Sequence, residues 1–327
     1  MSTAKPVIID CDPGIDDALC IALALASPEI DVLAVTTVAG NATVDITSFN
    51  ATAVLAACGR SDIQVGIGAR RALIHAYDHG QVPPHGPDGL GGAAIAPSTV
   101  EPASEHAVYL LRDVLRAAAP HSVTVVAIAP LTNIALLASL HPELLERIDR
   151  LVVMGGSASR GNVTPVAEFN VWTDPESAQR VLSDPGLDVC LVGLDVTRQA
   201  TLTENHLDIL RHRSRLGGLI ADMVWGYRDR TDDGWPIHDA VTVASVVAPS
   251  LLRTAPMYVE VDTGTGLTRG QTICEVADGG EPRIVGQGRY AAAGLVQVGV
   301  DVDVEAFRRL LMDRVGWEPG TREPSTV

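Results

Sequence analysis

Short runs of β-branched and other apolar residues alternate with longer Ala- and Leu-rich stretches along most of the chain. The short runs predict strands at residues 7–10, 32–38, 63–67, 123–128, 150–154 and 187–192. The longer stretches predict helices at residues 17–26, 44–58, 105–118, 133–140, 175–183 and 240–247. Because the predicted strands are apolar throughout, helices should cover both sides of the sheet, which is typical of a mainly parallel sheet.

The segment at residues 256–299 has a different pattern, with hairpin character and Gly-rich turns. It predicts an antiparallel edge on the parallel sheet. No repeat, low-complexity run or Pro/Ser-rich linker divides the sequence, so we expect a single α/β domain over residues 1–327. Ligands of open α/β sheets bind outside the carboxyl ends of the strands. Polar residues that directly follow a predicted strand are therefore the candidate site residues.

The charge and composition of the chain limit its partners and its location. Against 40 Asp plus Glu there are 24 Lys plus Arg, a formal net charge of -16, which argues against nucleic acid or an anionic membrane as partner. The start of the sequence has no signal-peptide hydrophobic stretch, and the most apolar stretch, 123–140, is broken by Pro130. The five cysteines are scattered and lack a CxxC spacing, as free thiols in a reducing compartment do. We expect a cytoplasmic protein.

The strongest chemical signal follows the first predicted strand. Four carboxylates fall within eight residues there, in the run Asp10-Cys11-Asp12-Pro13-Gly14-Ile15-Asp16-Asp17. They repel one another unless a cation or a capping interaction compensates. A helix N-cap would explain one aspartate and leave the others solvated, whereas a site for a hard cation explains the whole run. Because all the ligands are oxygens, Ca²⁺ or Mg²⁺ is favoured.

A second polar cluster follows the strand predicted at 150–154. Two glycines after Met154 allow a ligand to approach the backbone closely. Asn162, Glu168 and Asn170 then supply donors and acceptors that suit neutral hydroxyls. Neither a GxxxxGK loop nor a row of basic residues accompanies them, which disfavours phosphate recognition. A polar loop with turn-forming amides is the alternative interpretation of this segment taken alone.

Smaller signals lie at the ends of other predicted elements. His238 and Asp239 directly precede a predicted helix, where a loop histidine and an N-cap would explain them in isolation. Asn41 and Ile128 each lie at the carboxyl end of a predicted strand. The Gly- and Pro-rich run that begins at His85, HGPDGLGG, has the composition of a mobile lid and equally that of a plain surface loop.

Taken together, the motifs resemble those of the inosine–uridine-preferring nucleoside hydrolase family. They cover nearly the whole chain and occur in the family's order: DCDPGIDDA, TTVAGN, HGPDGLGG, APLTNIA, VVMGG, GNVTPVAEFNVWTDPESA and IHDA. The resemblance implies a single α/β domain around a mainly parallel sheet. It also implies hydrolysis of the N-glycosidic bond of purine and/or pyrimidine ribonucleosides to ribose and free base, with one tightly held Ca²⁺. A role in nucleoside salvage and a homodimer or homotetramer are further implications.

The resemblance also implies roles for particular residues. The Ca²⁺ ligands are expected to be the side chains of Asp12, Asp17 and Asp239 and the backbone carbonyl of Ile128, where the family often has Thr. Contacts to the ribose are expected from Asp16 and Asn41 at the hydroxyls, from Asn162, Glu168 and Asn170 on the rest of the sugar, and from Met154 against its face.

The chemistry that the resemblance implies divides between two catalytic residues. Asp12 would accept a proton from a Ca²⁺-bound water as general base, while C1′ becomes oxocarbenium-like. His238 would protonate the leaving base, a role that an imidazole side chain can fill. Trp225, Tyr227, Arg230 and Trp235 precede His238 in the segment expected to line the base pocket, and the base preference stays open.

Two other functions share some of these sequence features. Asp10 and Asp12 have the DxD spacing of haloacid-dehalogenase-like phosphatases, but Pro13 stands where that family has Thr or Val. The second alternative is a non-catalytic, calcium-dependent ribose- or nucleoside-binding protein on the same fold. The presence of both Asp12 and His238 favours catalysis over binding alone.

Overall fold

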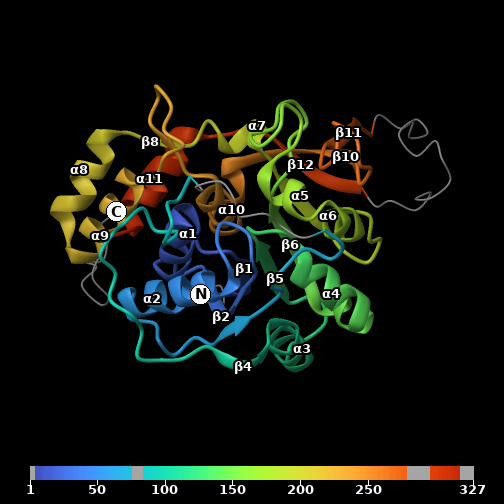
Figure 1. Cartoon of the computed structure of the whole chain (residues 1–327), viewed down its shortest axis with the longest axis horizontal. Helices are drawn as coiled ribbons and strands as arrows, with labels where there is room; N and C mark the ends of the chain where they lie inside the picture. Colours follow the sequence, from blue (N-terminus) through green and yellow to red (C-terminus); the bar gives the residue numbers. More distant parts are fainter. Residues whose placement is uncertain (1–3, 76–83, 278–294, 317–327) are drawn as a thin grey trace.

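A ten-stranded β-sheet with helices on both faces forms the centre of the protein (Figure 1). The computed structural model describes residues 4–75, 84–277 and 295–316. In chain order the strands of this sheet are β1 (Lys5–Cys11), β2 (Ile30–Thr37), β3 (Val65–Ile67), β4 (Ala103–His106), β5 (Val123–Ala127), β6 (Ile148–Met154), β7 (Val189–Val192), β10 (Leu252–Val261), β11 (Thr272–Val276) and β12 (Leu295–Val302). Across the sheet they run in the order β11-β10-β12-β7-β6-β5-β1-β2-β3-β4.

Helices of very different lengths connect these strands. They are α1 (Ile15–Leu25), α2 (Val44–Ala57), α3 (Ala107–Ala117), α4 (Thr132–Leu140), α5 (Phe169–Thr173), α6 (Pro175–Leu182), α7 (Leu194–Thr197), α8 (Glu204–Arg213), α9 (Arg215–Trp225), α10 (His238–Val247) and α11 (Val304–Arg314). Two 3-10 turns (Pro142–Arg147 and Pro249–Leu251) and a small antiparallel pair, β8 (Thr201–Leu202) with β9 (Trp235–Pro236), complete the structure. Among the described residues, no helix is long and apolar enough to span a bilayer.

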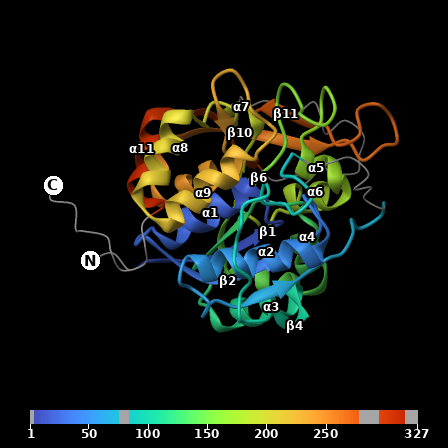
Figure 2. The ribbon, with the colours of Figure 1, turned by 60° about the vertical axis from the view of Figure 1, so that its left-hand side comes forward.

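Two hydrophobic cores lie on the two faces of the sheet. Along β1, Val7 and Ile9 belong to the core that includes α1, α9 and α10, whereas Ile8 belongs to the core with α3, α4 and α6. Successive side chains of a strand point to opposite faces, so an uninterrupted apolar strand contributes to both cores. In Figure 2, α8, α9 and α11 gather beside α1, away from α3.

The predicted fold class is confirmed: a mainly parallel sheet carries an antiparallel edge. Strands β1 to β7 of the sheet pair in parallel, and β12 joins β7 in parallel, whereas β10 pairs antiparallel with both β11 and β12. Part of the segment predicted as this edge, residues 278–294, lies outside the described residues.

The sequence pattern did not predict β4, β8, β9, α5, α7, α8, α9 or α11, and it misplaced the start of another element. It gave no strand at β4, whose sequence ASEH is an edge strand without an apolar run. It also missed α8, α9 and α11, amphipathic helices that bury a limited set of apolar side chains. The strand predicted at 63–67 begins at Val65, because Ile63 still closes a turn by donating its N–H to the carbonyl of Arg60.

A buried polar network ties the carboxyl end of β1 to its neighbours. Asp10 Oδ1 accepts hydrogen bonds from Thr36 Oγ1 at 2.5 Å and from Asn133 Nδ2 at 2.8 Å. Asn133 also donates to the carbonyl of Thr37 at 3.0 Å and accepts the N–H of Ala69 at 3.0 Å. Burial raises the pKa of Asp10 to about 6, although both side-chain hydrogen bonds lower it. Asp10, the first aspartate of the acidic run, therefore stabilises the packing of the strand ends.

We expect Asn133→Ala to lower the free energy of unfolding by about 3 kcal/mol, because it leaves Asp10 and the Ala69 N–H buried with fewer partners. Denaturant unfolding monitored by circular dichroism measures this change. The matched control is Asn205→Ala on the exposed face of α8, where we expect a change within about 0.5 kcal/mol. Equal unfolding midpoints for the two variants would contradict the expected contribution of this network to the free energy of unfolding.

Candidate metal and substrate site

The turn after β1 is built around the carboxylate of Asp17. Its Oδ1 accepts the N–H of Asp12 at 3.1 Å and its Oδ2 accepts the N–H of Gly14 at 2.9 Å. Gly14 is the N-cap of α1, so Asp17 reaches back from the first turn of the helix to the preceding loop. Neither Asp16 nor Asp17 is the N-cap; Asp17 caps the helix start from its third position, which accounts for one aspartate of the run.

Asp12 is held by the loop that follows β2. Its Oδ2 accepts the backbone N–H of Asn41 at 2.6 Å, and the Asn41 side chain donates to the carbonyl of Asp12 at 3.3 Å. A Cβ on Gly40 would lie 2.0 Å from Asp12 Oδ2, so only glycine fits there. Asp12 Oδ1 is buried and has no hydrogen-bond partner among the described residues. One oxygen of Asp12 is therefore fixed and the other is free for a ligand.

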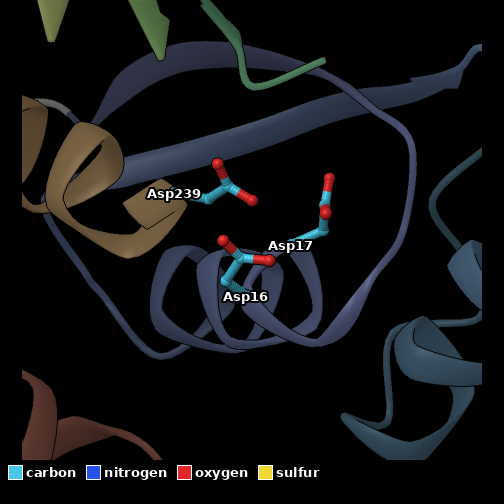
Figure 3. Close-up of side chains that lie close together, drawn as sticks. All are labelled: Asp16, Asp17 and Asp239. Atoms are coloured by element: carbon cyan, nitrogen blue, oxygen red, sulfur yellow. The ribbon is translucent and has the colours of Figure 1, made fainter. Parts of the chain in front are cut away.

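Three buried carboxylates converge beside this turn (Figure 3). Asp16, Asp17 and Asp239 each offer an oxygen, and these oxygens lie within 4.8 Å of one another. Asp239 comes from the first turn of α10, which packs against α1. Within the described ranges Asp16 Oδ1 is buried without a hydrogen-bond partner. Carboxylates this close cannot all be charged in a dry environment without a cation, so the cluster could hold a divalent metal.

Electrostatics point to the same conclusion. Burial, followed by the negative charge of Asp17, raises the pKa of Asp12 well above its ordinary value. Burial and the charge of Asp16 raise the pKa of Asp17 to about 7. The pKa of Asp239 is also raised well above its ordinary value, by burial first and then by Asp16 and Asp17. Protons or a bound cation must therefore compensate this cluster near neutral pH.

The predicted ligand set and this cluster overlap without being identical. Asp17 and Asp239 belong to both, whereas Asp16, expected at the ribose, lies in the cluster and Asp12 lies beside it. The carbonyl of Ile128 accepts a 3.3 Å hydrogen bond from Asn170 Nδ2, and a carbonyl oxygen can accept a second interaction.

The second polar cluster is organised by Glu168. Its carboxylate accepts the N–H groups of Asn170 at 2.9 Å, Gly156 at 2.9 Å and Val171 at 3.1 Å, and it caps α5. Burial raises the pKa of Glu168, and the three backbone donors lower it. Asn170 Nδ2 also donates to the carbonyl of Met154 at 3.2 Å, which places Asn170 between the ends of β5 and β6.

Asn162 and Met154 lie in different surroundings from Glu168 and Asn170. Asn162 is exposed, and its Oδ1 accepts the N–H of Phe169 at 2.9 Å, so the structure gives it a role in the shape of the loop. Met154 is buried at the carboxyl end of β6, beside the Asn170 amide.

His238 lies next to Asp239 at the start of α10. Its Nδ1 forms a 2.8 Å hydrogen bond with Thr197 Oγ1. Its Nε2 is buried without a hydrogen-bond partner in the described part of the chain and lies 3.7 Å from Asp229 Oδ2. The nearby His238 imidazole lowers the pKa of Asp229. No sequence motif distinguishes Thr197 or Asp229 from neighbouring polar residues, so neither was predicted as a site residue.

The loop that begins at His85 packs directly on the acidic turn. His85 is buried, its Nδ1 accepts the N–H of Ile15 at 3.1 Å, and it lies 3.8 Å from Asp16 Oδ1. Its ring stacks on Tyr227 with 4.8 Å between centroids, and Leu90 is also buried. Of the two interpretations of this loop, a plain surface loop does not fit. His85 therefore contacts the candidate site, although the sequence singled it out only as part of a loop.

Trp225, Tyr227, Arg230 and Trp235, which precede His238 in the sequence, differ in their burial and contacts. Tyr227 is buried against His85, and its carbonyl accepts the Trp235 Nε1–H at 3.1 Å. Trp225 is half exposed, and Arg230 lies over the Trp235 ring while pairing with Glu204. Tyr227 is therefore the member of this set with a direct contact to a site residue.

Comparison with known proteins gives consistent matches over almost the full length. Residues 7–309 match the family model described as inosine-uridine preferring nucleoside hydrolase. Non-specific ribonucleoside hydrolase RihC from Klebsiella pneumoniae subsp. pneumoniae is 38% identical over 316 residues, which are 96% of this chain and 99% of that protein. The protein of the same name from Escherichia fergusonii is 39% identical over 305 residues, 93% of this chain and 96% of that protein.

Solved structures agree with these sequence matches. A plant nucleoside hydrolase, the PpNRh1 enzyme, has a TM-score of 0.86 at 32% identity and covers 95% of this chain and 98% of its own. A purine-preferring ribonucleoside hydrolase from Gardnerella vaginalis has a TM-score of 0.84 at 31% identity, with the same coverage of 95% and 98%.

The raised carboxyl pKa values predict how stability depends on pH. Without a cation, the folded protein holds a proton on Asp17 up to about pH 7, whereas an unfolded chain releases it near 3.8. Stability of chelator-treated protein should therefore fall as the pH rises through that interval, and we expect the melting temperature to drop by about 5 °C between pH 5 and pH 7.5.

A divalent cation should reverse this loss, so its addition should raise the melting temperature more at pH 7.5 than at pH 5. Asp17→Asn, which removes one of the titrating groups, should show a smaller pH dependence without cation. A cation-free melting temperature that rises between pH 5 and pH 7.5 would contradict the assignment.

Proposed function

The chain belongs to the inosine–uridine preferring nucleoside hydrolase family, and on that premise we propose that it is a calcium-dependent ribonucleoside hydrolase. Its relatives and structural neighbours are ribonucleoside hydrolases, which are N-glycosidases. The reaction would cleave the bond between C1′ of the ribose and a nitrogen of the base, consuming one water. The observation that carries the proposal is the buried carboxylate cluster with Asp12 on one side and His238 on the other.

The residues present fit a calcium ion. Asp12, Asp17 and Asp239 and the carbonyl of Ile128 would hold it, and Asp16 adds a further oxygen nearby. All of these ligands are oxygens, and two of them, Asp12 Oδ1 and Asp16 Oδ1, are buried without another partner in the described ranges. When bound, Ca²⁺ supplies neutralisation of the carboxylates and polarisation of the attacking water.

Asp12 would act as the general base. The N–H of Asn41 fixes its Oδ2, which leaves Oδ1 to take the proton from the attacking water. The position is rigid because Gly40 packs against the same carboxylate. As the bond to the base breaks, positive charge develops at C1′, and the neighbouring carboxylates stabilise it.

His238 would protonate the departing base. A purine or pyrimidine leaves as an anion unless it gains a proton, and a positioned imidazole can supply one. Its Nδ1 is held by Thr197, so Nε2, which has no hydrogen-bond partner among the described residues, is the atom available to the base.

The ribose would lie between the carboxylate cluster and the loop after β6. Asp16 and Asn41 would meet its hydroxyls on one side, and Glu168 and Asn170 would meet it on the other. Met154 would pack against the sugar face, and Asn162 would contribute by closing the loop around it. Fixed donors and acceptors of this kind orient the sugar in the reactive geometry.

The proposed substrates are purine and pyrimidine ribonucleosides. The related RihC proteins are named non-specific, while the similar Gardnerella vaginalis enzyme is named purine-preferring. The resemblance in sequence further supports a cytoplasmic salvage enzyme that works as a homodimer or homotetramer.

Wild-type protein with Ca²⁺ should release ribose from inosine and uridine, and a chelator should abolish the release. In Ca²⁺-loaded Asp12→Asn we expect kcat to fall by about 1000-fold or more, because the proton acceptor is lost while a carboxamide keeps the shape of the site. A reducing-sugar assay measures turnover, and circular dichroism checks the fold.

Substantial activity in folded Asp12→Asn would remove Asp12 from the role of base. If wild-type protein releases no ribose from any nucleoside in a panel of purines and pyrimidines, the alternative of a non-catalytic ribose- or nucleoside-binding protein is favoured.

His238→Ala should separate substrates by their leaving groups. We expect kcat on inosine to fall about 100-fold and kcat on 4-nitrophenyl riboside to fall less than about 3-fold, because nitrophenolate departs without a proton. Steady-state kinetics on the two substrates measure the difference. Equal losses on both would remove His238 from the role of acid.

A further inference from the structure

The four-residue helix α7 lies between the two halves of the proposed site. It follows β7 directly and contacts α10, the helix that begins with His238. No motif in the sequence distinguishes this helix. Side chains in and next to this single turn contact both the loop after β6 and the imidazole of His238.

One side of α7 is fixed to the loop after β6. Asp195 Oδ2 accepts the N–H of Ala158 at 2.7 Å and the hydroxyl of Ser157 at 3.2 Å, and its Oδ1 accepts the hydroxyl of Ser159 at 2.5 Å. These three hydrogen bonds keep α7 from shifting unless the loop moves with it.

The residue that follows α7 adds a second attachment to the same loop. The Arg198 guanidinium donates to the carbonyl of Arg160 at 2.8 Å and to the carbonyl of Gly161 at 2.5 Å. Asp195 and Arg198 thus bracket Thr197 with contacts to one loop. The backbone that carries Thr197 is therefore a rigid support, as a group that orients another side chain requires.

Thr197 itself contacts His238. Its side chain is fully buried, and its Oγ1 lies 2.8 Å from His238 Nδ1. A threonine hydroxyl can either donate to or accept from an imidazole nitrogen, so it holds the ring in either tautomer. The 3.7 Å separation between His238 Nε2 and Asp229 Oδ2 is too long for a hydrogen bond, and Asp229 is half exposed. Thr197 is therefore the contact that fixes the ring plane.

We propose that Thr197 is a positioning residue that aims His238 Nε2 at the leaving base. The inference rests on the proposed acid role of His238. Because Thr197 acts through the imidazole, its loss should impair only the step in which the base gains a proton. Binding of the ribose should be unaffected, since the sugar contacts come from other elements.

The test compares Thr197→Val with Thr197→Ser in the full-length, Ca²⁺-loaded protein. Valine keeps the buried volume and removes the hydroxyl, so we expect kcat on inosine to fall about 10-fold with KM within about 2-fold of wild type. On 4-nitrophenyl riboside kcat should stay within about 2-fold. Serine restores the hydroxyl and should return kcat on inosine to within about 3-fold of wild type.

Thr242→Val is the matched control. Thr242 is also buried, on the same helix as His238, and in the part of the chain that the structure describes its Oγ1 makes no hydrogen bond. The same chemical change there should leave both activities within about 2-fold of wild type. If Thr197→Val fails to fold, as its melting curve would show, Thr197→Ala provides the same loss of the hydroxyl with less bulk and the same expected pattern.

The inference is overturned if the Val or Ala variant loses activity equally on both substrates, loses none, or is not rescued by Ser. His238→Ala measured in parallel separates the two levels. If His238→Ala shows the loss that depends on the leaving group and Thr197→Val does not, the positioning role fails and the acid role stands. If His238→Ala loses both activities equally, the acid role itself fails.

Discussion

The mutual repulsion of buried carboxylates after β1 is the constraint on which the rest of the site depends. Asp12, Asp16, Asp17 and Asp239 lie together with very little solvent contact, although each is an expensive group to bury. The fold opposes this cost with hydrogen bonds to fixed backbone groups, as at Asp12 and Asp17, but Asp12 Oδ1 and Asp16 Oδ1 have no hydrogen-bond partner among the described residues. Near neutral pH such a cluster must either keep protons on its carboxylates or bind a cation.

The sheet brings these groups together because its parallel strands end at one edge. β1 lies between β2 and β5, so the turn with Asp12, the loop with Asn41 and the carbonyl of Ile128 are neighbours by topology. The Asp10–Asn133 network then fixes the strand ends relative to one another. Residues of one sequence motif thus have two different roles: Asp10 stabilises the strand ends, whereas Asp16 and Asp17 lie in the carboxylate cluster.

Much of the fold was predictable because buried parallel strands are apolar on both faces, while β4 was not, because a polar edge strand carries no such signal. The acidic run indicated a cation site by its density alone. The position of Asp239 beside Asp16, however, depends on how α10 packs against α1, and local sequence does not encode that contact. The same holds for Thr197, which becomes notable only when His238 is seen against it.

The distance in sequence between the members of the carboxylate cluster has a consequence for synthesis of the chain. Asp16 and Asp17 emerge from the ribosome early, whereas Asp239 follows only after most of the sheet has been made. A nascent chain that ends before α10 contains two of the three carboxylates and lacks the helix that packs over them. The complete cluster can therefore form only late in synthesis. An ion that needs all three carboxylates stabilises the finished chain and does not stabilise its N-terminal half alone.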